Sequence, residues 1–205
     1  MLAAVGLSAA HGACLYPSRG HNIKMKFKNW NIQTIDQILP EEFYALIDRN
    51  RNHISRTFPV TVSNCENFEK TIAFLAESVE KQEKNEGHYF YIRHSETKNL
   101  IGYVCIKNVD QKIRKCELAY FIDQDFEGKG IISEAVAQTI DFCFSQLSMN
   151  KVFICTSKIN VGSQRIATKN GFSHEGVLRE EFKSGEGILE DINYFGLLKS
   201  EWNER

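Results

Sequence analysis

A short turn built on two glycines is the segment of this 205-residue sequence best suited to hold an anion. Gly128 and Gly130 are separated by a single residue, Lys129, and lie between a predicted strand and a long predicted helix. Glycine lets the backbone turn tightly, and a helix N-terminus adds unpaired N–H groups and the positive end of its dipole. The spacing therefore predicts a socket for phosphate oxygens, with a plain strand-to-helix turn as the alternative. The expected donors are the backbone N–H groups of Phe126, Glu127, Gly128, Lys129, Gly130 and Ile131.

The residues around this turn exclude two other phosphate-binding motifs. The third glycine of a dinucleotide fingerprint would fall at position 133, which is Ser133. The sequence also contains neither GxxxxGKS nor GxxxxGKT, so it has no P-loop. A metal site is not expected, because His88 and His94 lie on one predicted strand without further ligands.

Three other residues have the chemistry that proton transfer needs. Glu117 and Glu181 lie in predicted strands, and Ser163 stands near the start of a short predicted helix. An α-amine with a pKa of about 7.7–8 is already partly neutral, so a modest base is sufficient to activate it. Each residue also has a structural alternative to a catalytic role. Glu117 would pair with a neighbouring Lys or Arg, Glu181 would belong to a charged surface patch, and Ser163 would cap its helix.

The elements that position these residues are expected in the order β, α, α, β, β, β, α, β, α, β, β. Pro40 opens the first helix, Ser63–Glu66 has a capping-box pattern before the second, and residues 52–62 are predicted to form a loop. This order predicts a mixed α/β sandwich whose sheet has antiparallel and parallel parts. Strands are expected at 25–36, 88–94, 99–107, 115–123, 152–155, 172–183 and 188–198, and the later helices at 131–147 and 163–169.

Composition and charge limit the class of protein. The chain is 42% hydrophobic and has a formal net charge of −1, which excludes a disordered chain and a nucleic-acid binder with a bulk basic face. No apolar run reaches the roughly 18 residues of a membrane span. The six cysteines form no CxxC pair, which is typical of buried thiols in the cytoplasm. Residues 1–24 are interpreted as a dispensable N-terminal extension, and residues 25–205 as one domain.

Five segments have an order and spacing that are more specific together than any one of them alone: Glu117–Ile122 (ELAYFI), Gln124–Ala135 (QDFEGKGIISEA), Asn160–Phe172, Glu175–Arg179 and Asp191–Leu198. With these segments, the sequence resembles the GNAT acetyltransferases over residues 25–205. It is most similar to the Rim-type branch, which acetylates the N-termini of ribosomal proteins. The resemblance implies a GNAT fold, in which helices flank a mixed, mostly antiparallel sheet whose fourth and fifth strands are parallel and splayed.

The resemblance also implies acetyl-CoA as the co-substrate, with its pyrophosphate on the glycine turn. Its pantetheine arm is expected between the splayed strands, hydrogen-bonded by Asn160. Its thioester carbonyl is expected near Phe121 and Ile122, where a backbone N–H polarises it. The sequence departs from the superfamily at Asp125, where Gln or Arg is usual, and this carboxylate is expected to point away from the phosphates.

For catalysis, the resemblance implies that Ser163 protonates the departing thiolate, where other GNAT enzymes use a tyrosine. Glu117 and Glu181 are the two candidates for the base that takes the proton of the amine. Tyr120 and Tyr194 are interpreted as core or pocket-wall aromatics.

The predicted function is transfer of an acetyl group to a primary amine by direct attack in a ternary complex. The leading acceptor is the N-terminal α-amine of a ribosomal protein. A small amine (a polyamine, an aminoglycoside or an amino-acid derivative) and a non-catalytic acetyl-CoA-binding module are the alternatives. The loop at 52–62 and the closing hairpin carry no obvious acidic cluster for a polycation, which favours a peptide. Neither nucleic acid nor a membrane is an expected partner, and the chain is expected to be a monomer or a homodimer.

Overall fold

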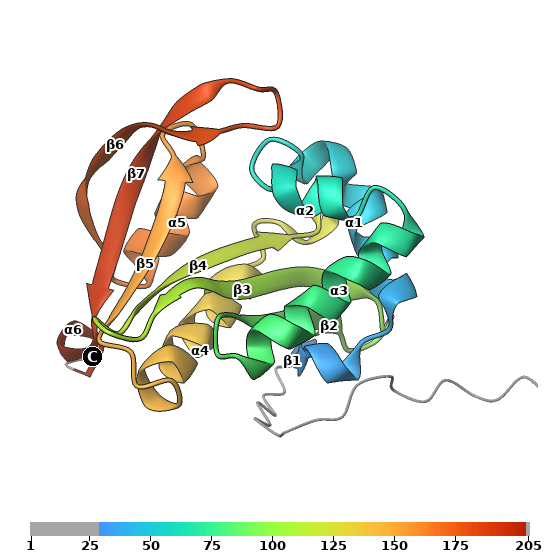
Figure 1. Ribbon diagram of the computed structural model, residues 1–205, viewed down its shortest axis with the longest axis horizontal. Helices are drawn as coiled ribbons and strands as arrows, with labels where there is room; N and C mark the ends of the chain where they lie inside the picture. Colours follow the sequence, from blue (N-terminus) through green and yellow to red (C-terminus); the bar gives the residue numbers. More distant parts are fainter. Residues whose placement is uncertain (1–28, 204–205) are drawn as a thin grey trace, which may run out of the picture.

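A seven-stranded sheet organises residues 29–203, the part of the chain described by this computed structural model (Figure 1). The strand order is β1-β2-β3-β4-β5-β7-β6, and among these strands only β4 and β5 pair in parallel. The predicted mixed, mostly antiparallel sheet is confirmed, whereas the proposed extension at 1–24 lies outside the described residues. The strands are β1 (Trp30–Thr34), β2 (His88–His94), β3 (Leu100–Asp110), β4 (Lys115–Ile122), β5 (Lys151–Ser157), β6 (Ser173–Lys183) and β7 (Leu189–Leu198).

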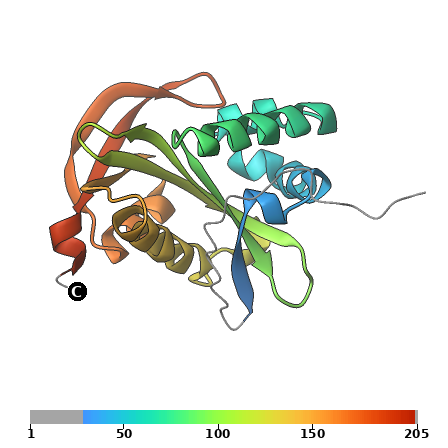
Figure 2. The same ribbon diagram turned by 60° about the horizontal axis from the view of Figure 1, so that its bottom comes forward.

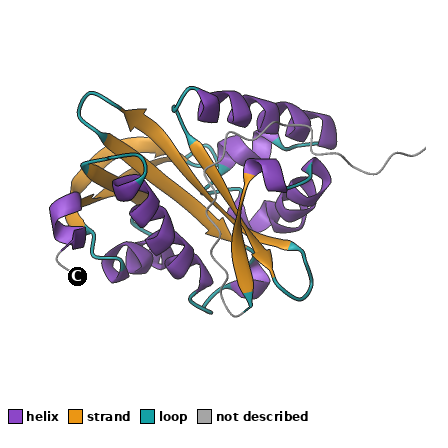
Figure 3. Ribbon diagram, turned by 90° about the horizontal axis from the view of Figure 1, so that it is seen from below, coloured by secondary structure: helices purple, strands orange, loops and turns teal. Residues whose placement is uncertain are grey.

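Helices cover both faces of the sheet, as the views in Figures 2 and 3 show. The helices α1 to α3 lie on one face, and α4 and α5 lie on the other. Short 3-10 turns, η1 (Ile35–Gln37) and η2 (Gln124–Phe126), follow β1 and β4. The helices are α1 (Pro40–Ile54), α2 (Pro59–Asn64), α3 (Phe68–Glu83), α4 (Ile131–Ser145), α5 (Val161–Lys169) and α6 (Lys199–Asn203).

The central strands are apolar on both sides because both sides are covered. In β2, Tyr89 and Tyr91 belong to the core under α1 and α3, whereas Phe90 and Ile92 belong to the core under α4. Strands that are buried on both faces lose the polar–apolar alternation of a half-exposed strand. This explains the continuous apolar runs in the middle of the sequence.

The parallel strands β4 and β5 pair over a short stretch and then separate (Figure 1). Their register ends at the pair Glu117↔Phe153. Beyond it, the residues 118–122 of β4 pair with β3 alone, while β5 continues beside β7. The predicted splay of the fourth and fifth strands is therefore confirmed.

The prediction of a loop over residues 52–62 is wrong for most of that range, because only residues 55–58 lie between helices. Helix α1 continues to Ile54, and Pro59 then opens α2, because its missing N–H and fixed φ suit the first helical position. The guanidinium of Arg51 ties the two helices together. It donates to the carbonyl oxygens of Val62 and Cys65, at 3.2 and 2.9 Å.

Two predicted helix caps fall on other residues. Asn67 rather than Ser63 caps α3, since its side-chain oxygen accepts the N–H of Lys70 at 2.9 Å. Asn160 caps α5 by accepting the N–H of Ser163 at 3.0 Å. Ser163 therefore lies inside the first turn of α5, and its hydroxyl is not the cap.

Within residues 29–203, no helix is both long and apolar enough to span a membrane.

Candidate active site

Gly128 and Gly130 adopt backbone conformations that favour glycine, with φ of +70° and +78°. Gly130 is the N-cap of α4, whose first hydrogen bond runs from the N–H of Glu134 to the Gly130 carbonyl oxygen at 3.1 Å. The N–H groups of the preceding first turn have no helical acceptor. A Cβ on either glycine would meet no atom within 4 Å, so the outer side of the turn is open. This geometry suits an anion.

The expected N–H donors of this turn differ in what they already bind. The N–H of Phe126 donates to the Asp123 carbonyl oxygen at 2.8 Å, and the N–H of Glu127 donates to that of Gln124 at 3.4 Å. Both hydrogen bonds belong to the 3-10 turn η2. The donors that remain open therefore begin at Gly128.

Two charged residues flank the glycines. Lys129 bends back over the turn, with its Nζ 2.7 Å from the Asp125 carbonyl oxygen and 4.6 Å from the centre of the Phe126 ring. Asp125 is exposed, and its backbone rather than its carboxylate binds the lysine. The positive character of the turn thus comes mainly from backbone N–H groups.

Phe121 and Ile122 end β4 beside the splay, and each is 6% exposed. On one side they pair with Tyr103 and Gly102 of β3. On the other side, β4 has no strand partner after Glu117 among the described residues. An extended ligand can pair with such an open edge as an additional strand does.

The hydroxyls of Tyr120 and Ser163 meet where β4 and β5 separate. Their oxygen atoms are 3.1 Å apart, and the Tyr120 Oη is also 3.3 Å from the Ser163 carbonyl oxygen. Burial raises the pKa of Tyr120 above its usual value, so its hydroxyl stays protonated. Asn160 fixes the same turn of α5 through the N–H of Ser163. The hydroxyl of the predicted site residue Ser163 is thus hydrogen-bonded to Tyr120, which sequence reasoning had placed in the core or the pocket wall.

Glu117 is buried, and both of its oxygens are engaged. Its Oε1 lies 3.1 Å from the Nζ of Lys107, and its Oε2 accepts the Nδ2–H of Asn108 at 2.7 Å. Burial lowers the pKa of Lys107, but the Glu117 carboxylate outweighs that effect and raises it. The structure therefore contains the ion pair that sequence reasoning offered as the structural explanation of Glu117.

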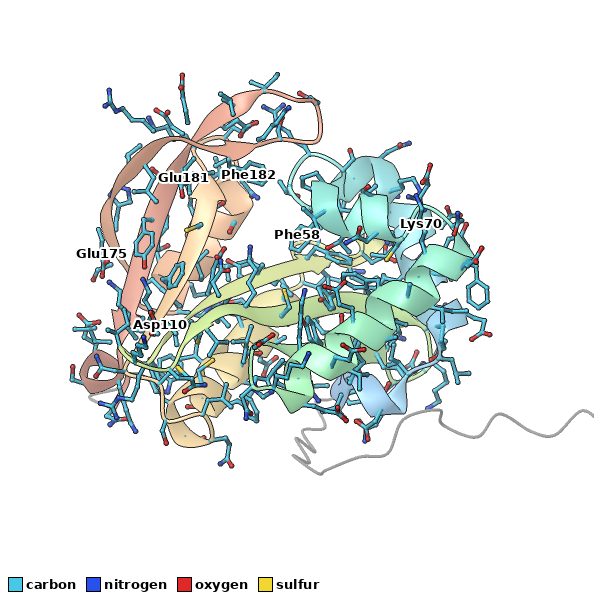
Figure 4. The ribbon with its side chains drawn as sticks, viewed as in Figure 1. Phe58, Lys70, Asp110, Glu175, Glu181 and Phe182 are labelled. Atoms are coloured by element: carbon cyan, nitrogen blue, oxygen red, sulfur yellow. The ribbon has the colours of Figure 1, made fainter. Side chains whose placement is uncertain are left out.

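Glu181 lies on β6, where the register with β7 is irregular between Leu178 and Phe182 and Glu180 has a φ of +53°. Its side chain is exposed and its carboxylate has no hydrogen-bond partner within residues 29–203. In Figure 4, Glu181 and Phe182 lie near the end of β5, and Phe58 lies across from them on the α2 side. Glu181 is the candidate carboxylate that remains free to take a proton.

Cys155 on β5 shows that the two glutamates share one region. Burial is the main cause that raises the pKa of the Cys155 thiol to about 12, and the charges of Glu117 and Glu181 add to the rise. Both carboxylates therefore lie within electrostatic range of β5, next to the splay.

A comparison with protein families shows where this arrangement belongs. The family model described as the acetyltransferase (GNAT) domain matches residues 35–173, more than half of the chain. The chain belongs to the GNAT acetyltransferase family. Because acetyltransferases of this family use acetyl-CoA, the enzyme class and co-substrate predicted from the sequence are confirmed.

The names of individual relatives point to two kinds of substrate, ribosomal proteins and spermidine. YdaF of Bacillus subtilis, named as a ribosomal N-acetyltransferase, is 38% identical over 104 residues, which cover 51% of this chain and 56% of YdaF. The spermidine N(1)-acetyltransferase of Vibrio cholerae is 25% identical over 163 residues, covering 80% of this chain and 90% of that enzyme. The crystal structure of the ribosomal-protein-S5-alanine acetyltransferase of Vibrio fischeri has a TM-score of 0.77 at 21% identity, covering 88% and 99% of the two chains. That last likeness shows the fold.

Sequence reasoning missed the residues that anchor residues 124–131, which we name the coenzyme turn for its predicted role. Asp123 is buried at the end of β4, with a carboxylate oxygen 2.5 Å from the Nε of Arg49. Its other oxygen accepts the N–H of Asp125, while Asn50 accepts the N–H of Gln124, at 3.1 and 3.0 Å. Burial raises the pKa of Asp123, but these partners, Arg49 first, bring it below its usual value. Arg49 and Asn50 lie 74 positions from the groups they bind, so no local pattern indicates them.

Proposed function

We propose that this acetyltransferase acts on the N-terminal α-amine of a protein, with residues 25–205 as its catalytic domain in the cytoplasm. The choice of acceptor rests on a contact between the tip of the β6–β7 hairpin and the end of α1, on the side of the sheet opposite α4. In this contact, which we call the bridge, the N–H of Gly185 donates to the Arg56 carbonyl oxygen at 3.3 Å. A narrow chain end passes beside such a bridge more readily than a lysine on a folded surface.

The coenzyme turn and the open edge of β4 are the groups that suit acetyl-CoA. The open N–H donors from Gly128 to Ile131 and the dipole of α4 match pyrophosphate oxygens. The unpaired edge of β4 up to Phe121 and Ile122 matches the amides of a pantetheine arm. Asn160, whose side chain caps α5, would contribute through its backbone.

Proton transfer is assigned to the groups beside the splay. Ser163 gives its proton to the departing thiolate and receives the proton of the Tyr120 hydroxyl, 3.1 Å away, in return. Burial keeps that tyrosine hydroxyl protonated before the transfer. Glu181 takes the proton of the attacking amine directly or through a water. Glu117 is not the base in this proposal. Through its ion pair with Lys107, it holds β4 and β3 in register.

A polyamine is the second candidate, because a spermidine acetyltransferase is among the relatives. The carboxylates near the bridge argue against it. Glu186 and Glu190 bind Arg56, and Asp191 binds Lys158 at 2.9 Å. Few carboxylates remain free to hold several ammonium groups at once.

A thiol-release assay with acetyl-CoA tests the proposal. The acceptors are peptides that begin with Ser, Ala or Met, the same peptides with blocked N-termini, and spermidine. We expect CoA release with free peptides and none with blocked ones, even where these contain lysine. Turnover of spermidine without turnover of any peptide would contradict the proposal.

A further inference from the structure

Four residues at the C-terminal end of α1 each bind a segment far away in the sequence. Arg49, Asn50, His53 and Arg56 follow a spacing that repeats close to the helical turn, so they project on one side of α1 and its extension. Of these, the first three bind the coenzyme turn or its anchor, and the last binds the β6–β7 hairpin. This row of side chains therefore connects the two regions on which the proposed function depends.

The contacts with the coenzyme turn span its whole N-terminal part. Asn50 is 1% exposed and accepts the N–H of Gln124, at the start of η2. The Nε2 of His53 lies 3.1 Å from the Oε1 of Glu127, the residue that directly precedes Gly128. A shift of α1 therefore moves the backbone whose N–H groups face the anion.

The contacts with the hairpin combine side chains and backbone. The Arg56 guanidinium lies 3.1 Å from Glu186, in the hairpin tip (residues 184–188), and 2.8 Å from Glu190, at the start of β7. A Cβ on Gly185 would lie 2.1 Å from the Ser55 carbonyl oxygen, so only glycine permits this approach of the two backbones. The tip therefore rests directly on the segment that continues α1.

We infer that this side of α1 couples the coenzyme turn to the acceptor hairpin, with His53 and Arg56 as positioning residues. The inference rests on the proposed function, because it assumes that acetyl-CoA binds the turn. A ligand that orders the turn restrains α1 through Asn50 and His53, and α1 in turn restrains the hairpin tip through Arg56. Coupling of this kind makes acetyl-CoA prepare the acceptor side before an acceptor arrives.

Hydrogen exchange of the full chain, followed by mass spectrometry with and without acetyl-CoA, tests the coupling. In the wild type, acetyl-CoA slows exchange at residues 124–134 and also at residues 184–190. In Arg56→Gln, the protection of the turn persists and that of the hairpin is lost. In His53→Gln, the protection of the hairpin is reduced. The control is Asn52→Ala, since Asn52 is exposed on α1 and its side chain has no hydrogen bond within residues 29–203; it keeps both effects.

The other outcomes are distinguishable. Protection of the turn without protection of the hairpin in the wild type overturns the coupling and leaves the proposed function standing. Hairpin protection that is unchanged in Arg56→Gln would also overturn the coupling and leave the proposed function standing. Protection of neither segment by acetyl-CoA overturns the proposed function together with the coupling. Because His53 and Arg56 are partly exposed, melting temperatures close to that of the wild type will show that each variant is folded.

Discussion

The two regions that the proposed function assigns to the coenzyme (the coenzyme side) and to the acceptor (the acceptor side) are built from different kinds of contact. On the coenzyme side, the open donors belong to one continuous segment, from Gly128 into the first turn of α4. On the acceptor side, the contacts join side chains that are far apart in the sequence, such as Arg56 and Glu190, 134 positions from each other. Backbone donors serve any sequence that folds in the same way, whereas side chains change with single substitutions. Under the proposed function, this difference would let one fold keep the same coenzyme while its acceptor changes.

The largest effect is expected where the two sides meet, at the hydroxyl pair. Ser163→Ala should lower kcat by about 100-fold, the lower end of the range for a general acid, with little change in the KM for acetyl-CoA. Tyr120→Phe should lower kcat less, because Ser163 retains its own hydroxyl. Steady-state kinetics with a peptide acceptor measures both. An unchanged kcat in Ser163→Ala would remove the serine from the proposed mechanism.

The acceptor side is tested alone by Gly185→Ala. Its Cβ would clash with the Ser55 carbonyl oxygen, so the hairpin tip must move away from α1. We expect kcat/KM for a peptide to fall roughly 10- to 100-fold, as misplaced substrate-positioning groups do. The Kd for acetyl-CoA should change by a much smaller factor, because the hairpin reaches the glycine turn only through α1. Kinetics and calorimetry on one preparation measure the two quantities. An equal loss in both would erase the distinction between the two sides.

The anchor of the coenzyme turn is tested through pH. The pKa of Asp123 is lowered in the folded chain, so its stabilising contribution is present above pH about 4, the unfolded value, and is lost as the pH falls through the folded pKa. Asp123→Asn should cost about 1–2 kcal/mol at neutral pH, and this gap should close in acid. Urea unfolding between pH 7 and pH 2.5 measures it. A gap that does not change with pH would show that the charge of Asp123 does not stabilise the fold.

The smallest effect is expected from the lysine beside the glycines. Lys129→Ala should weaken acetyl-CoA binding less than about fivefold, since an exposed charge contributes at most about 1 kcal/mol. Calorimetric titration measures the Kd. A much larger loss would mean that a side chain, and not the backbone, carries the affinity.

The parts of the molecule that local patterns determine were predicted well from the sequence. β2 spans His88–His94 as expected, and α1 and α4 begin at Pro40 and Ile131, where proline and glycine signal a start. The helix α2 was missed, because its six residues mix polar and apolar side chains without a helical pattern. Its C-terminal carbonyl groups are bound by Arg51 of α1, a contact that the sequence does not show.

The same division applies to the candidate site. The glycine turn is local, and its left-handed φ values agree with the role of glycine that the spacing indicated. The partner of Ser163 is Tyr120, 43 positions away, and it becomes visible only when β4 and β5 are placed side by side. The bridge between Arg56 and the hairpin depends in the same way on tertiary packing.

Calorimetric titration of acetyl-CoA into wild-type chain, Gly128→Val, Gly130→Val and Lys129→Ala tests the central claim, that the backbone of the glycine turn holds the coenzyme. A Cβ at either glycine meets no protein atom, but a left-handed φ costs a residue other than glycine about 1–2 kcal/mol and distorts the donors. We expect binding by the wild type and the lysine variant, and at least tenfold weaker binding by both valine variants, since about 1.4 kcal/mol corresponds to a factor of ten in Kd. Valine variants that bind like the wild type, or a wild type that does not bind, would contradict it.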